Sequence, residues 1–153
     1  MIGWGGGYME DPIYQLLTDG ALYHPQEDSW TAMSETGAPS PRDGATELWT
    51  GTEFIIWGGS PYDNGVVGSG AAYEPNEDSW SPTTAQSAAT ARVHHSSVWT
   101  GSEMIVWGGA GGSAVLADGA RYDPVSDSWS QVSSLGAPAA RSSHKAVWTG
   151  SVM

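Results

Sequence analysis

Residues 97–109, SVWTGSEMIVWGG, decide the fold of this chain. Two tryptophans frame a Thr-Gly-Ser turn and a continuous apolar run, and the run ends at a double glycine. This order predicts a β-hairpin whose second strand is buried on both faces. The pattern returns at residues 47–59, and its first half returns at residues 146–153. The chain is therefore built from internal repeats, whose period determines the architecture.

All nine tryptophans belong to the repeat. Three precede Gly-Gly (Trp4, Trp57, Trp107), three follow Asp-Ser (Trp30, Trp80, Trp129) and three precede Thr-Gly (Trp49, Trp99, Trp148). The step from the second set to the third is 19 residues in every copy, whereas the step from the first set to the second is 26, 23 and 22 residues. One segment per repeat absorbs the variation in length, as expected of a surface loop.

Each repeat predicts four strands, here named a to d. Strand a ends at Trp-Thr-Gly, strand b is the apolar run before Gly-Gly, strand c leads into a tyrosine, and strand d carries the Asp-Ser tryptophan. A turn rich in Pro, Asn, Glu and Asp joins strands c and d. Gly3 stands where the other copies have Ile56 and Val106, so strand b of the first copy should be weaker.

These residues resemble the kelch repeat, and the Trp-Thr-Gly-Ser and Ile-Val-Trp-Gly-Gly motifs resemble its bacterial type. The resemblance covers the whole chain and implies an all-β, kelch-type β-propeller in which each repeat supplies one four-stranded blade. It predicts a single domain over residues 1–153, with repeats at approximately 1–53, 54–103 and 104–153.

Met1 and Met153 fall at the same position of the repeat. The first copy therefore has no strand a, and the last segment, residues 143–148, is a strand a without a blade. Because propellers have about 4 to 8 blades, three cannot close a ring alone. Two copies that exchange strand a would form a six-bladed homodimer without open edges. A piece cut from a longer kelch propeller is the alternative.

Composition limits the partners and the chemistry. A formal charge of -12 repels phosphate backbones and anionic lipid, which argues against nucleic acid and membrane partners. The absence of cysteine excludes disulfides and thiolate metal sites but leaves the compartment unknown. Kelch-type propellers include galactose oxidase-like copper enzymes, whose cofactor needs a cysteine, so the resemblance does not extend to that activity.

Three arginines lie seven residues before the Thr-Gly tryptophans: Arg42, Arg92 and Arg141. The resemblance places them near the mouth of the central channel, where they could bind an anion or carboxylate. Their repetition with the scaffold favours a structural role, in which each bonds backbone carbonyls or an acidic neighbour. His95 and His144 repeat in the same way, and we expect packing and hydrogen bonding from them; no metal or cofactor is predicted.

The b–c loops hold the tyrosines outside the repeat pattern: Tyr8, Tyr14 and Tyr62. Asp63 lies beside the last of these. Such loops could bind a protein, peptide or glycan, or their apolar residues could fold back onto the blades. We expect a non-catalytic binding module that also binds itself. The alternative is a sugar epimerase or hydrolase at the channel mouth, although no acid–base pair is evident from spacing.

Overall fold

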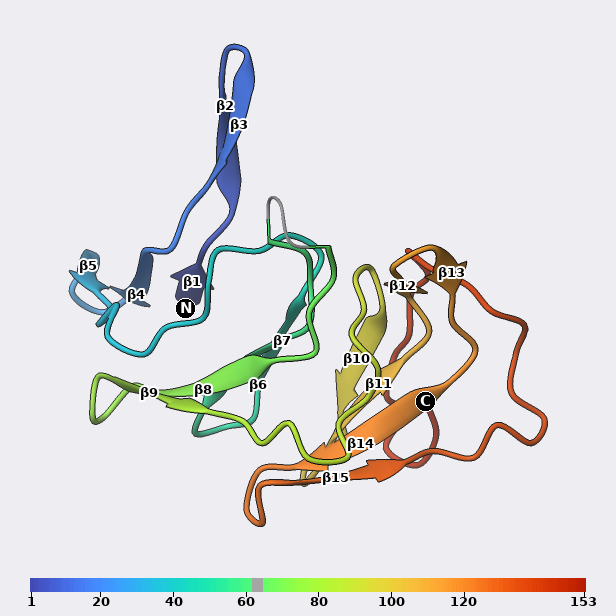
Figure 1. Cartoon of the computed structure of the whole chain (residues 1–153). Coiled ribbons are helices and arrows are strands. Elements are labelled where there is room, and N and C mark those ends of the chain that lie inside the picture. Colours follow the sequence, from blue (N-terminus) through green and yellow to red (C-terminus); the bar gives the residue numbers. More distant parts are fainter. Residues whose placement is uncertain (62–64) are drawn as a thin grey trace.

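The computed structural model of the chain is all-β and describes residues 1–61 and 65–153. Three larger antiparallel sheets lie side by side in chain order, and each has the strand order predicted for one blade (Figure 1). No helix in these two ranges is long and apolar enough to cross a membrane. The predicted all-β repeat architecture is therefore confirmed.

The second and third repeats form complete blades. Blade 2 consists of β6 (Thr46–Trp49), β7 (Phe54–Trp57), β8 (Gly70–Glu74) and β9 (Ser79–Pro82). Blade 3 consists of β10 (Ser96–Trp99), β11 (Met104–Trp107), β14 (Gly119–Asp123) and β15 (Ser128–Gln131). Their registers match, since the tryptophan that ends strand a faces the first residue of strand b, Trp49 opposite Phe54 and Trp99 opposite Met104.

Blade 1 has three strands: β1 (Ile2–Trp4), β4 (Gly20–His24) and β5 (Ser29–Ala32). Strand β1 is one of the two edge strands of this sheet and includes Gly3. The expectation of a strand over residues 143–148 is wrong for the single chain, because this segment has no strand assignment. A β-strand needs a neighbour to pair with, and no strand of the described residues pairs with this segment.

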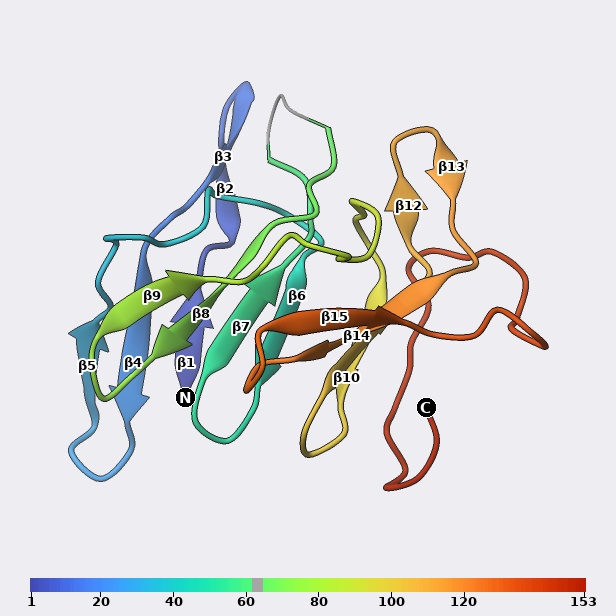
Figure 2. The ribbon, with the colours of Figure 1, turned by 60° about the horizontal axis from the view of Figure 1, so that its bottom comes forward.

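Two b–c loops are hairpins. β2 (Gly7–Glu10) pairs with β3 (Ile13–Leu16), and β12 (Ala110–Gly111) pairs with β13 (Ala114–Val115). Both hairpins extend from the same side of the molecule, away from the c–d turns (Figure 2). We call this side the loop face.

Two hydrophobic cores fill the spaces between the three sheets. The core between blades 1 and 2 contains Trp4, Met33, Phe54, Ile56, Ala71, Tyr73 and Trp80. The core between blades 2 and 3 contains Leu48, Ile55, Trp57, Ala89, Met104, Val106, Ala120, Tyr122 and Trp129. β7 contributes to both cores from alternate residues, which confirms the prediction of a strand buried on both faces for the second repeat. In β11 the prediction holds for one face only, because Met104 and Val106 are buried but Ile105 and Trp107 are half-buried.

Candidate functional site

The two internal junctions between blades repeat one set of contacts. At the junction of blades 2 and 3, Trp129 Nε1 donates to Thr84 O (3.1 Å), and Thr84 N donates to Asp127 Oδ1 (2.8 Å). At the junction of blades 1 and 2, Trp80 Nε1 donates to Ser34 O (2.8 Å). Blades 2 and 3 thus each form hydrogen bonds to the loop that follows strand d of the preceding blade.

An aspartate of the same blade also accepts a hydrogen bond from this loop. Asp78 Oδ1 accepts hydrogen bonds from Ser34 N and from the hydroxyl of Tyr73, both at 2.7 Å. These donors lower the pKa of Asp78, the tyrosine hydroxyl contributing most. The carboxylate of Asp78 therefore accepts from a residue outside its own turn. Its backbone has a φ of 48°, so its carboxylate turns back toward Tyr73 and the neighbouring blade.

At the open end of blade 1 the corresponding contacts have no partner blade. Trp30 is 56% exposed, whereas its equivalents Trp80 and Trp129 are each 7% exposed. Asp28 Oδ1 accepts from Tyr23 Oη at 2.7 Å, as in the other blades. At the opposite end of the molecule, Ser133 holds the repeat position of Ser34 and Thr84. The chain therefore exposes both halves of a blade junction at its two ends.

Histidines link the inner ends of the blades. His95 Nε2 lies 2.7 Å from Thr46 Oγ1 of the preceding blade, and His144 Nε2 lies 2.8 Å from Ser96 Oγ. Each ring also stands edge-on to a tryptophan, His95 to Trp57 with centroids 5.4 Å apart and His144 to Trp107 with centroids 5.3 Å apart. The prediction that these histidines pack and form hydrogen bonds is confirmed.

The buried environment of His95 predicts that the folded protein loses stability in acid. Burial, followed by the charge of Arg92, lowers the pKa of His95 to about 4. The unfolded chain binds this proton near pH 6.5, so the stabilisation is complete above that pH and is lost as the pH falls toward 4. We expect the free energy of unfolding to fall by about 3 kcal/mol over this window.

Urea unfolding at several pH values measures this loss, with His95→Gln as the comparison. The amide can keep a hydrogen bond to Thr46 but does not titrate. An equal loss in His95→Gln over the same window would contradict the assignment.

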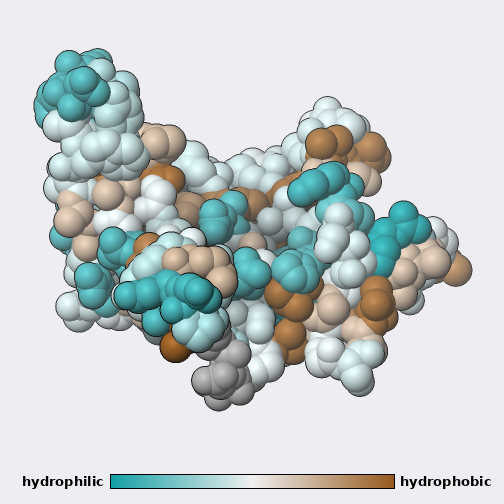
Figure 3. All heavy atoms as spheres, turned by 90° about the horizontal axis from the view of Figure 1, so that it is seen from above, coloured by the Kyte–Doolittle hydropathy of each residue, from teal (hydrophilic) through white to brown (hydrophobic). Residues whose placement is uncertain are grey.

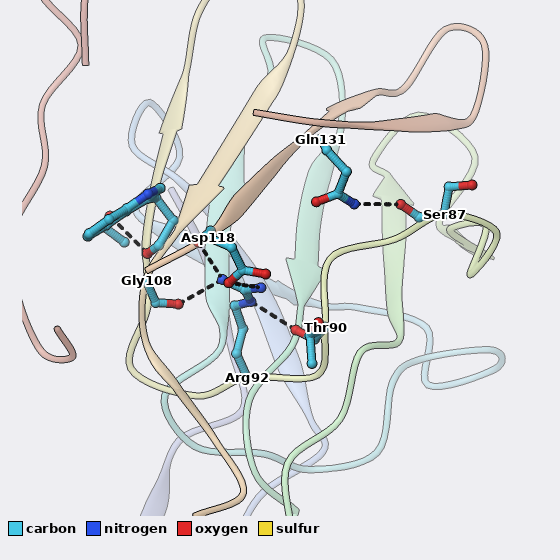
Figure 4. A network of polar contacts seen from close by, with 8 residues as sticks. Ser87, Thr90, Arg92, Gly108, Asp118 and Gln131 are labelled. Carbon is cyan, nitrogen blue, oxygen red and sulfur yellow. Dashed lines mark hydrogen bonds and ion pairs between the residues drawn. The ribbon is translucent and has the colours of Figure 1, made fainter. Parts of the chain in front are cut away.

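Two buried arginines hold blades 2 and 3 together internally. Arg42 is 7% exposed and Arg92 is fully buried. Arg92 donates from Nε to Thr90 O (2.8 Å), from Nη1 to the O atoms of Gly108 and Asp118 (both 2.9 Å), and from Nη2 to Asp118 Oδ1 (3.0 Å; Figure 4). Burial lowers the pKa of both guanidiniums. This burial leaves them little surface for a ligand.

Arg42 makes the same contacts with a different acceptor. Its Nη1 donates to the O atoms of Gly58 (3.1 Å) and Ser69 (2.9 Å), and its Nη2 donates to Ser40 Oγ (3.0 Å) instead of to a carboxylate. Arg141 is exposed, and its Nε donates to Ala139 O at 2.9 Å. By repeat position, the acceptors that correspond to Gly108 and Asp118 around Arg92 are Gly5 and Asp19, which belong to blade 1.

The loop face gathers some of the predicted binding residues and separates others. Tyr8 on β2 is 49% exposed, and Tyr14 on β3 is 40% exposed. They do not face each other directly, because Tyr8 pairs with Gln15 and Met9 pairs with Tyr14. Tyr62 and Asp63 lie outside the described residues.

Apolar residues also stand out from the loop face. Met9 and Ile13 on the first hairpin and Val115 on the second are all at least half exposed, so they do not fold back onto the blades. Figure 3 looks down on this face and shows apolar surface at β12–β13. These exposed apolar side chains were missed as a site because their hairpins are not shared by all the repeats.

Comparison with known proteins agrees with the geometry of the blades. The family model described as KLHDC2/KLHL20/DRC7 Kelch-repeats domain matches residues 1–153. No curated protein matches the chain significantly. The match covers the three repeats defined by the tryptophans and the sheets. The chain belongs to the kelch-repeat family.

Proposed function

We propose that the chain is a self-assembling half propeller, in which two copies related by a twofold axis form one non-catalytic six-bladed ring. The observation that carries the proposal is the exposure of Trp30, 56% against 7% for each of its two equivalents. A blade placed before blade 1 would cover this indole and supply the acceptor for its Nε1. Blade 3 of a second copy has the required Ser133 loop.

The segment to be exchanged is already held in place. Gly109 N donates to Arg141 O (2.8 Å), as Gly59 N does to Arg92 O (2.8 Å) in the preceding junction. Beyond this contact, Thr149 N donates to Val152 O (3.0 Å), which is the turn that follows strand a in the other blades. Residues 146–148 thus have a docked start and a formed turn, which reduces the entropy lost when they pair.

The register of the exchange follows from the complete blades. Counting from their pairs places Val147 of one copy opposite Ile2 of the other, and Ala146 opposite Gly3. Val147 is 71% exposed, whereas Val98 at the same repeat position is 7% exposed. In this register Met153 overlaps the position of Met1 of the other copy and must turn aside.

Two further contacts are expected at each seam. Trp107 of one copy would meet Trp30 of the other, because Trp57 meets Trp129 with ring centroids 5.0 Å apart. Arg141 would meet Asp19, as Arg92 meets Asp118 at 3.0 Å. Ala139 carries no hydroxyl like that of Ser40, so the Asp19 carboxylate is the acceptor left for Arg141.

Cysteine crosslinking tests the exchange. The chain has no cysteine, and a β-carbon at Gly3 would have no heavy atom within 4 Å. We expect Gly3→Cys/Ala146→Cys to oxidise into a covalent dimer of about 32 kDa, twice 16.0 kDa, because opposed strand residues lie within disulfide range. Gly3→Cys/Ser143→Cys is the shifted control. A crosslinked monomer would indicate a three-bladed ring, and no crosslink would contradict the exchange.

We propose further that the loop face binds a protein or peptide with apolar side chains, with a glycan as the alternative ligand. Kelch domains generally mediate protein binding, and the projecting hairpin exposes Tyr8 and Ile13 on one face and Met9 on the other. A twofold axis through the channel would place two such hairpins on one side. Tyrosine supplies contact area with a polar tip, as is common in interfaces.

Peptide and glycan arrays test this second role. We expect Tyr8→Ala/Tyr14→Ala to lower binding at least tenfold, because these rings provide much of the exposed aromatic surface of the hairpin. Val125→Ala is the control, since Val125 is 95% exposed in the c–d turn of blade 3, on the opposite side. Equal binding by all three proteins would contradict the assignment of the ligand to β2–β3.

A further inference from the structure

The histidine contacts distinguish one junction of the ring from the others. At two junctions a hydroxyl on strand a meets an imidazole of the next blade: Thr46 with His95, and Ser96 with His144. The same repeat positions at the third junction hold Lys145 and Ala45. Both members of the pair have changed, and they lie in different repeats of the chain.

The space beside Gly5 of blade 1 is open. A β-carbon at Gly58 would lie 2.9 Å from His95 Cε1, and one at Gly108 would lie 2.8 Å from His144 Cε1. At the equivalent Gly5, the nearest atom to such a β-carbon is Leu17 O at 3.6 Å. The volume that an imidazole fills at the two other junctions is therefore vacant beside Gly5.

We propose that this vacancy receives the side chain of Lys145 from a second copy, which makes Lys145 and Ala45 a matched pair where the exchanged strand of blade 1 meets blade 2. The inference rests on the proposed ring. In the expected register Lys145 lies opposite Trp4, just as Thr46 lies opposite Trp57. Its stem packs against the indole of Trp4, where His95 packs against Trp57, and its ammonium group lies near the ring face.

The pair also explains which blade receives the exchanged strand. Lysine is longer than serine or threonine and cannot share the space beside Gly58 or Gly108 with the imidazole already there. A donated segment carrying Lys145 therefore fits blade 1, whose neighbour carries Ala45, and is rejected where the next blade carries histidine. Such exclusion gives specificity in addition to the attraction of the matched surfaces.

Mixing two variants tests the pairing. Ala45→His crowds Lys145, and Lys145→Ser leaves the vacancy unfilled, so each homodimer should dissociate at least tenfold more readily than wild type. In a mixture, the heterodimer has two different junctions between blades 1 and 2. One combines the native Lys145 and Ala45, and the other combines the introduced serine and histidine, which copies the Ser96–His144 contact. We expect the ratio of heterodimer to total homodimer to exceed its statistical value of one at least several-fold, as measured by native mass spectrometry with one chain isotope-labelled.

The double variant Ala45→His/Lys145→Ser is the second measurement, and we expect its dissociation constant to return to within about threefold of wild type. Circular dichroism checks that every variant folds. If the wild type is a dimer but the two variants mix at the statistical ratio, and their effects simply add in the double variant, the Lys145–Ala45 pairing is wrong and the ring still stands. A monomeric wild type would overturn both this pairing and the ring on which it depends.

Discussion

Arg92→Ala should lower the free energy of unfolding by roughly 3 to 5 kcal/mol, which corresponds to a fall of about 10 °C in melting temperature. Arg92 is fully buried, and its guanidinium donates to Thr90, Gly108 and Asp118. Alanine would leave buried carbonyl groups unpaired and a cavity around them. Calorimetry and urea unfolding of the variant measure the effect.

Arg121→Ala is the matched control, because the Arg121 side chain is 45% exposed and its contact with Glu103 is 3.6 Å long. We expect a change below about 0.5 kcal/mol from it, since exposed ion pairs contribute little. If Arg92→Ala instead kept its melting temperature and lost binding of a carboxylate ligand, Arg92 would be a ligand contact and not a structural residue.

Trp30→Ala should raise the dissociation constant of the dimer at least 100-fold while the isolated chain keeps its sheets. The indole contacts Tyr23 within blade 1, with ring centroids 4.9 Å apart, but most of its surface is free in the single chain. Buried tryptophans are typical centres of binding energy in interfaces, and each ring would contain two of these indoles. Sedimentation equilibrium over a concentration series gives the constant.

Trp80→Ala is the comparison at the same repeat position. Trp80 is buried in the core between blades 1 and 2, so its loss should destabilise the folded chain itself by roughly 3 to 5 kcal/mol. Similar effects of the two substitutions on monomer stability, with dimerisation unchanged in Trp30→Ala, would mean that Trp30 does not lie at a seam.

Much of the fold could be predicted because the repeat fixes it. The three sets of tryptophans, with a constant 19-residue step, define strands a and d, and the apolar run of residues 54–57 defines a strand buried on both sides. These signals are local and occur more than once. The hairpin β2–β3 was missed because its alternation, with Tyr8, Met9, Ile13 and Tyr14, occurs in one repeat only.

The contacts between blades could not be predicted from one repeat alone. The bond from Ser34 N to Asp78 joins residues 44 positions apart, and only the packing of neighbouring sheets brings them together. The exceptional residues Ala45 and Lys145 are visible when the repeats are aligned. Their relationship becomes apparent only from the Thr46–His95 and Ser96–His144 distances, which show that these two repeat positions touch across a junction.

The molar mass of the wild-type protein in solution tests the ring most directly. Light scattering coupled to size exclusion, run over a range of loading concentrations, should give about 32 kDa, twice the 16.0 kDa of one chain. Two copies close the ring at six blades, within the usual range of about 4 to 8, whereas a third would exceed it, so the mass should not rise further at high concentration. A stable, folded species of 16.0 kDa throughout the series would contradict the ring.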